Sequence, residues 1–144
     1  MVEHTKQFTV FAVGEEWYGI DILHLSSIEL LDGIRIVPNA DPAIMGVVNI
    51  RGSLLPVVDL RYLLYRKKME VTEACRLLVC AETLGSFVLA VNEASDIWEI
   101  DLASIEELSD APYKKGISHV EGTLVTILDG AQLAKEIEHQ VQKQ

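Results

Sequence analysis

The chain alternates between short apolar segments, rich in β-branched and aromatic residues, and turn signals built from Gly, Asp, Ser and Pro. Segments of this kind predict β-strands rather than long helices. Glycine-containing turns at 14–16, 51–53 and 122–123 join neighbouring segments into predicted hairpins. The expected strands cover residues 7–13, 17–20, 27–30, 46–50, 54–58, 77–81, 87–91, 97–100, 117–120 and 124–128.

Helix signals are confined to a few places between and after these strands. Residues 21–25 and 41–45 each predict a single helical turn, the second with Asp41 as its N-cap. Residues 60–68 predict a short helix that ends in a basic cluster. The last segment predicts a longer helix that begins after Asp129 and carries one apolar stripe. This stripe consists of Leu133, Ile137 and Val141.

The sequence contains an internal repeat at an offset of 70 residues. Residues 46–59 align with residues 116–129, and the same offset relates 8–13 to 78–83. Several positions of the longer pair are identical in both copies, namely Gly46, Gly52, Leu54 and Asp59. One constant offset over most of the chain indicates two related β units, although any two β-hairpins share some similarity.

Each unit would hold about 70 residues and roughly five short strands, a size that rarely buries enough apolar surface to fold alone. The two units are therefore expected to share a core. Short strands with many turns suit small, partly open barrels better than a flat sandwich. The sequence predicts one all-β domain over residues 1–144, built from two barrel halves at about 1–70 and 71–144, with short helical turns and a C-terminal helix.

Charge and composition narrow the function classes. The 12 Lys and Arg residues against 22 Asp and Glu residues give a net charge of −10 at pH 7. Such an excess of acid argues against nucleic-acid binding. No apolar run approaches the roughly 20 residues that span a bilayer, and the N-terminal residues lack the pattern of a secretory signal. We therefore expect a cytoplasmic protein that meets membranes only through a partner.

The sequence offers no constellation for catalysis, for a metal or for a cofactor. The four histidines fit no metal-binding motif, and no nucleophile, phosphate-binding or dinucleotide-binding motif occurs. No histidine lies close in sequence to Cys75 and Cys80, so we interpret both as buried strand residues in a reducing compartment. We expect neither enzymatic activity nor a bound metal or cofactor.

The apolar content of the hairpins favours an interaction protein. Both strands of the hairpin over 46–58 are almost entirely apolar, which is more than the inward positions of small barrels can hold. Exposed apolar patches on a soluble protein commonly mark partner sites. We therefore favour an adaptor. The alternative from another class is a small ligand-binding or enzymatic β-barrel, which would need a cluster of convergent polar groups.

Five segments form a familiar set when they are taken together. The most specific are GVVNIRG at 46–52 and LPVVDL at 55–60, and the others are YGIDI at 18–22, VP at 37–38 and VNE at 91–93. In this combination the chain resembles the CheW family, the coupling proteins of bacterial chemotaxis. The resemblance covers nearly the whole chain.

Membership of this family would imply two intertwined SH3-like five-stranded barrels and a non-enzymatic scaffold. Such proteins link the regulatory domain of the histidine kinase CheA to the cytoplasmic hairpin tips of chemoreceptors, in signalling arrays beneath the membrane. An adaptor of the same fold in a related kinase pathway, such as surface motility or biofilm signalling, is an open alternative. Two positions depart from the family pattern, since Asn92 stands in place of Asp and Ser118 in place of Gly.

Arg51 is the leading candidate for a partner-binding residue. It lies at the tip of a predicted hairpin among apolar neighbours, and the resemblance places the matching residue near the receptor-binding surface. The repeat has Glu121 at the equivalent position, so the turn itself does not require a cation. A structural arginine would need an internal acid or carbonyl, whereas a functional one would offer its planar donors to a partner.

Four further residues complete the candidate partner-binding set. Val47 and Asn49 belong to the GVVNIRG motif, and a hydrogen bond to neighbouring backbone is the alternative role for Asn49. Leu25 and Ile28 flank a predicted bend, and packing in the core is the alternative role for both.

Overall fold

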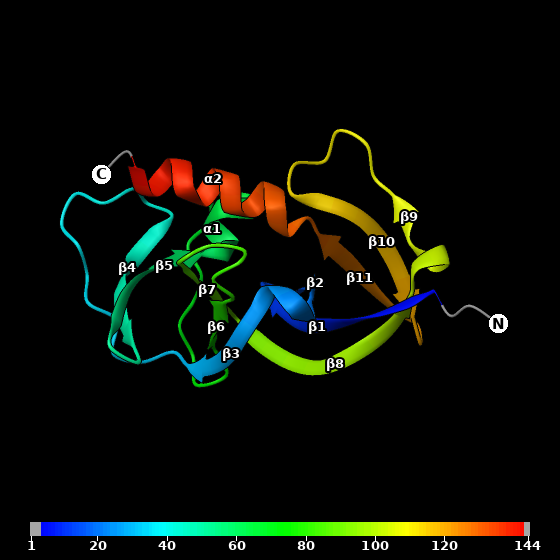
Figure 1. Cartoon of the computed structure of the whole chain (residues 1–144), viewed down its shortest axis with the longest axis horizontal. Coiled ribbons are helices and arrows are strands. Elements are labelled where there is room, and N and C mark those ends of the chain that lie inside the picture. The colour runs from blue at the N-terminus through cyan, green and yellow to red at the C-terminus, as the bar shows by residue number, and fades with distance from the viewer. Residues whose placement is uncertain (1–3, 143–144) are drawn as a thin grey trace.

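Figure 1 shows the computed structural model, which describes residues 4–142 of the chain. Its strands form one six-stranded and one five-stranded sheet. The strands are β1 (Thr5–Val13), β2 (Glu16–Asp21), β3 (Leu25–Leu30), β4 (Ile44–Ile50), β5 (Ser53–Asp59), β6 (Arg76–Cys80), β7 (Val88–Val91), β8 (Glu93–Asp101), β9 (Glu106–Glu107), β10 (Lys114–Val120) and β11 (Thr123–Leu128). The helical elements are η1 (Ile22–His24), α1 (Leu60–Tyr65), η2 (Leu102–Ser104) and α2 (Gly130–Gln142).

Each sheet combines strands from both copies of the repeat. The six-stranded sheet has the order β8-β1-β2-β11-β10-β9, and the five-stranded sheet has the order β3-β6-β7-β5-β4. Parallel pairing of β2 with β11, and of β5 with β7, joins the copies within each sheet. The two sheets therefore do not coincide with residues 1–70 and 71–144. Turn signals specify only local hairpins, whereas these pairings join strands that lie far apart in the sequence.

The all-β prediction is confirmed, and each sheet forms one of two small barrel-like lobes (Figure 1). The three predicted hairpins are present as β1–β2, β4–β5 and β10–β11. No helix within residues 4–142 combines the length and the apolar character needed to span a membrane.

Two local predictions were wrong. Residues 41–45 form a β-turn that leads into β4, not a helical turn. The Asp41 carboxylate still accepts a backbone hydrogen bond, from the N–H of Ala43 at 2.9 Å. The helix predicted over residues 60–68 ends at Tyr65, because Arg66 adopts the left-handed conformation with a φ of 62°. An Asp–Pro pair and a basic cluster fit a turn or a loop as well as they fit a helix.

The largest core cluster lies between the two sheets, so the predicted shared core is confirmed. Phe11 and Tyr18 reach this core from the six-stranded sheet, and Leu78 and Leu89 reach it from the five-stranded sheet. The helix α2 lies across the junction of the two lobes (Figure 1). Its predicted apolar stripe faces this core, with Leu133 and Ile137 buried and Val141 partly buried.

A smaller cluster fills the interior of each barrel. In the five-stranded barrel it includes Val57, Met69 and Leu77. In the six-stranded barrel it includes Phe8 and Ile127. Each barrel therefore has its own apolar interior and also contributes to the core between the sheets.

Burial determines the chemistry of the two cysteines. Cys75 and Cys80 are both free and buried, and burial raises the pKa of the Cys80 thiol to about 12. Such a thiol stays protonated and unreactive at neutral pH.

Asn92 accepts a hydrogen bond from the N–H of Gly14 at 2.7 Å and so connects β7 to the β1–β2 turn. This contact uses the side-chain oxygen, which Asn and Asp share.

Ser118 lies inside β10, at a position where the resemblance described above would lead us to expect a glycine. Its side chain is fully buried, and its hydroxyl lies 3.0 Å from the hydroxyl of Ser104 in η2. A buried hydroxyl without a partner would cost free energy, and Ser104 supplies that partner. The contact joins β10 to η2, the turn that follows β8.

Candidate partner-binding surface

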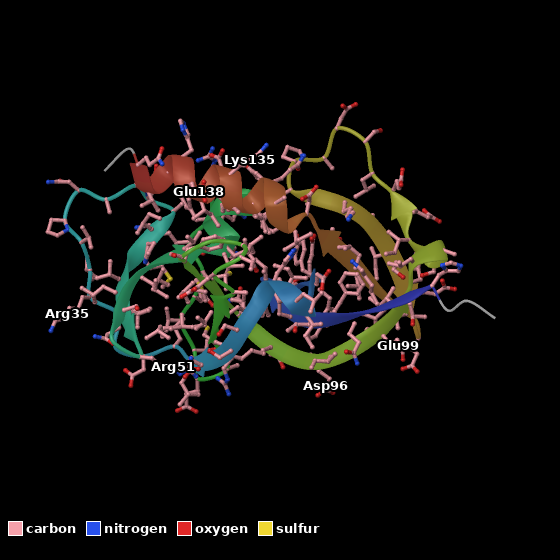
Figure 2. All side chains as sticks on the ribbon, in the orientation of Figure 1. Arg35, Arg51, Asp96, Glu99, Lys135 and Glu138 are labelled. Carbon is pink, nitrogen blue, oxygen red and sulfur yellow. The ribbon has the colours of Figure 1, made fainter. Side chains whose placement is uncertain are left out.

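The five candidate residues all belong to the five-stranded barrel, four on its strands and one in a turn. Leu25 and Ile28 belong to β3, Val47 and Asn49 belong to β4, and Arg51 lies in the turn between β4 and β5. In the hydrogen-bonded order of the sheet, β3 and β4 are the two outer strands. Because the barrel curls, the β4–β5 turn comes back to β3, and Figure 2 shows Arg51 beside that strand.

Arg51 faces solvent and lies close to an acid on β3. Its Nη2 atom is 3.7 Å from Oε2 of Glu29, and the two side chains are 69 % and 39 % exposed. An ion pair this exposed contributes only about 0–1 kcal/mol to folding. The left-handed backbone of Arg51, with a φ of 50°, is matched by Glu121 with a φ of 48°. The turn conformation therefore does not depend on the arginine side chain.

Asn49 is exposed but serves the hairpin. Its Oδ1 atom accepts a hydrogen bond from the N–H of Gly52 at 2.9 Å. Gly52 has a φ of 90°, in the left-handed region that favours glycine. The local backbone bond weighed as the alternative role for Asn49 is therefore present, and it helps to fix the turn that presents Arg51.

Val47 is partly covered by the segment that precedes β4. Its backbone N–H and C=O each form a 2.8 Å hydrogen bond with the backbone of Arg35. This isolated bridge closes the outer edge of β4 at its centre. The side chain of Val47 is half-buried. A partner can therefore reach the side chain, but the strand edge at this residue is already paired.

Leu25 and Ile28 differ in their exposure. Leu25 is half-buried and packs against the core between the sheets. Ile28 is 43 % exposed and points outward from β3. The side chain of Ile28 is therefore available for contact with another molecule, whereas the packing of Leu25 agrees with its alternative role in the core.

Sequence reasoning missed three residues of this region. Glu29 holds the ion pair with Arg51, and Leu30 and Leu54 are 67 % and 66 % exposed. Leu54 lies opposite Asn49 in the hairpin. The alternation of Ile28 and Leu30 is a strand signal, but it does not reveal which face is outward. We define the β3–hairpin surface as Ile28, Glu29, Leu30, Asn49, Arg51 and Leu54.

The β3–hairpin surface combines apolar and charged groups. It contains three exposed aliphatic side chains, two on β3 and one on β5, together with Arg51 and the acid that pairs with it, Glu29. Interfaces commonly place apolar anchors beside arginine, because arginine offers both packing area and a planar set of donors. The arrangement suits a protein surface better than it suits a small molecule.

Comparison with known proteins gives a consistent result. Residues 7–138 match the family model of the CheW-like domain. The chain is 31 % identical to the chemotaxis protein CheW of Bacillus subtilis, with 91 % of this chain and 88 % of that protein covered. It is 32 % identical to the chemotaxis protein CheW of Helicobacter pylori, with 93 % and 84 % covered.

A solved structure shows the same fold. The crystal structure of the scaffolding protein TtCheW from Thermoanaerobacter tengcongensis superposes with a TM-score of 0.77 at 25 % sequence identity. The superposition covers 86 % of this chain and 84 % of that one. The match of the family model over nearly all of the chain, the two relatives and this structure agree. The chain belongs to the family of CheW-like domains.

Proposed function

We propose that the protein is a non-enzymatic adaptor of bacterial chemotaxis that couples chemoreceptors to a CheA-type histidine kinase. The match to the CheW-like domain over residues 7–138 carries this proposal. Its relatives are named chemotaxis proteins, and its structural neighbour is named a scaffolding protein. The adaptor works in the cytoplasm and joins membrane-associated receptor arrays through its partners.

The β3–hairpin surface is our candidate for the receptor contact. We expect the receptor tip to present apolar side chains together with carboxylates or accessible backbone carbonyls. Ile28 and Leu54 would pack against the apolar side chains, and Arg51 would donate to a carboxylate or a backbone carbonyl. The exposure of these side chains supports this assignment.

A titration with the kinase regulatory domain tests the adaptor role. Calorimetry in a buffer free of nucleotide and metal is expected to show a saturable complex, because the contact is between protein surfaces alone. A parallel titration uses a receptor fragment that contains the cytoplasmic hairpin. Failure to bind either partner, or turnover of a substrate by the isolated protein, would contradict the proposal.

Arg51→Ala tests the assignment of the surface. We expect a melting temperature close to that of the wild type, because the pair with Glu29 is exposed. We expect receptor binding to weaken by about 2–5 kcal/mol, the usual cost of removing one partner of a desolvated charged hydrogen bond. Arg51→Lys should restore little of this loss, because a point charge cannot make the bidentate contact.

Asp96→Asn is the matched control, since this exposed residue lies on β8 outside the β3–hairpin surface (Figure 2). A large drop in the melting temperature of Arg51→Ala, with unchanged affinity in the folded fraction, would show that Arg51 has a structural role instead.

A further inference from the structure

The interior of the five-stranded barrel is closed by a methionine from a loop. Met69 follows α1 and is only 7 % exposed, inside the apolar cluster of that barrel. Its backbone N–H donates a 3.0 Å hydrogen bond to Oδ2 of Asp59. The other carboxylate oxygen, Oδ1, accepts the N–H of Tyr62 at 3.1 Å and so caps α1. One aspartate therefore starts a helix and also holds the segment that fills the barrel.

Asp129 is the counterpart of Asp59 in the six-stranded barrel. The two residues are 70 positions apart and follow equivalent strands. The N–H of Asp59 donates to the carbonyl of Ala43 at 2.8 Å, and the N–H of Asp129 donates to the carbonyl of Tyr113 at 2.7 Å. Oδ1 of Asp129 caps α2 by accepting the N–H of Gln132 at 3.1 Å. The capping role is therefore preserved in both copies.

The second carboxylate oxygen of Asp129 differs from that of Asp59, which accepts the N–H of Met69. Within residues 4–142 no group donates a hydrogen bond to its Oδ2 atom. The two helices differ in length. Helix α1 ends at Tyr65, and the loop after it turns back to the barrel, whereas α2 continues to Gln142. The residue 70 positions after Met69 is His139, which is exposed on α2. Within the described part of the second copy, the position equivalent to Met69 therefore lies on a helix and not in a loop that enters the barrel.

A cavity of about 410 Å³ opens beside Asp129 in the six-stranded barrel. Phe8 and Ile127, two members of the interior cluster of that barrel, form part of its apolar wall. Asp129, Glu107 and Lys115 also line it. This volume lies in the range of protein sites that bind a ligand, and the cavity pairs an apolar wall with an available acceptor.

We propose that this cavity binds an extended segment of a partner protein in which basic residues precede a methionine. The methionine side chain enters the cavity against Phe8 and Ile127, and its backbone N–H donates to Oδ2 of Asp129. This is the arrangement that Met69 and Asp59 already form in the other barrel. The site is separate from the β3–hairpin surface, and the proposal does not depend on the proposed function.

The charged residues around the cavity favour basic residues immediately before the methionine of the partner segment. In this chain Met69 itself follows Arg66, Lys67 and Lys68. At the cavity Lys6 is paired with Asp21 at 3.2 Å, which leaves the carboxylates of Glu107 and Asp129 opposite one further cation, Lys115. The net charge of −10 adds a general attraction for cations.

A peptide that copies residues 64–72 of this chain, LYRKKMEVT, is the probe. We expect saturable binding of the labelled peptide to the full chain, with NMR shift changes at Phe8, Ile127 and the first turn of α2. Replacing the peptide's methionine by alanine should weaken binding by about tenfold or more, because the apolar anchor is lost.

Asp129→Asn tests the carboxylate in the protein. Asparagine caps a helix as well as aspartate does, so the melting temperature should change little. The affinity for the peptide should fall by about tenfold, because a charged acceptor is lost. Asp96→Asn removes the same charge from the side of the molecule away from α2 (Figure 2) and should leave the affinity nearly unchanged.

Three results would overturn the proposal. The first is the absence of saturable binding at millimolar peptide. The second is an equal loss of affinity in Asp129→Asn and Asp96→Asn, which would indicate general attraction between the acidic protein and a basic peptide. The third is a set of NMR shift changes confined to the surroundings of Asp59, which would mean that the peptide only displaces Met69.

Discussion

Cutting the chain between residues 70 and 71 should leave two fragments that do not fold separately. The cut falls in the loop between α1 and β6. It separates β1 from β8, β2 from β11, β3 from β6 and β5 from β7, which are four of the nine pairings between strands within residues 4–142. Each fragment keeps only its own hairpins, and small hairpins without a packed face are marginal in water.

The core side chains that the cut exposes determine how much folding free energy each fragment loses. In the first fragment the cut uncovers five side chains of this core that consist of hydrocarbon alone and are at most 1 % exposed in the whole chain. These are Phe11, Val13, Ile20, Val58 and Leu60. Burial of such a side chain stabilises by about 1.5–3 kcal/mol, so their exposure costs about 8–15 kcal/mol. This equals the whole stability of a typical domain, which is about 5–15 kcal/mol.

Expression of residues 1–70 and 71–144 as separate polypeptides provides the assay. Each fragment alone should give an NMR spectrum with poor dispersion and no cooperative thermal transition. An equimolar mixture should recover the dispersed spectrum of the whole chain, because every missing pairing is between the fragments. A cooperative transition in either fragment alone would refute the shared-core reasoning.

Two further predictions concern single residues. Gly46→Ala should destabilise the protein by about 1–3 kcal/mol or more, because the new Cβ would lie 2.1 Å from the carbonyl oxygen of Arg35. Gly33 also has a positive φ, of 72°, but a Cβ there would meet no atom within 4 Å, so Gly33→Ala should lose less stability in chemical denaturation. Burial raises the pKa of the Asp21 carboxyl, but the N–H of Leu23 and the ammonium of Lys6 outweigh burial, so its pKa lies below 3.8. Asp21 therefore stabilises the fold above pH 3.8 and this contribution disappears as the pH falls through the lowered pKa, so the unfolding free energy of Asp21→Asn should change less with pH across this acidic range; an unchanged dependence would contradict the assignment.

The sequence could predict local structure because local structure has local signals. The hairpin β4–β5 follows from its two apolar runs and the Gly52 turn, and β10–β11 follows from the same pattern 70 residues later. The exchange of strands between the copies has no such signal. The parallel pairing of β2 with β11 joins residues more than 100 positions apart, and periodicity does not record the partner of a buried strand.

The candidate surface was predictable only in part, for a related reason. Arg51 stands out in the sequence as a cation at an apolar hairpin tip, and its exposure agrees with that reading. Glu29 has no distinctive spacing relative to Arg51, and only the curl of the barrel brings the two together. The cavity beside Asp129 was also hidden, because its wall combines residues that lie far apart in the sequence, such as Phe8, Glu107 and Ile127.

The coupling role is tested most directly by sedimentation velocity of three components: this protein, the regulatory domain of a CheA-type kinase and a receptor hairpin fragment. An adaptor with separate contacts for each partner predicts a ternary species that disappears when this protein is omitted and diminishes with Arg51→Ala. Only binary complexes, with the kinase domain and the receptor fragment excluding each other, would contradict the coupling role.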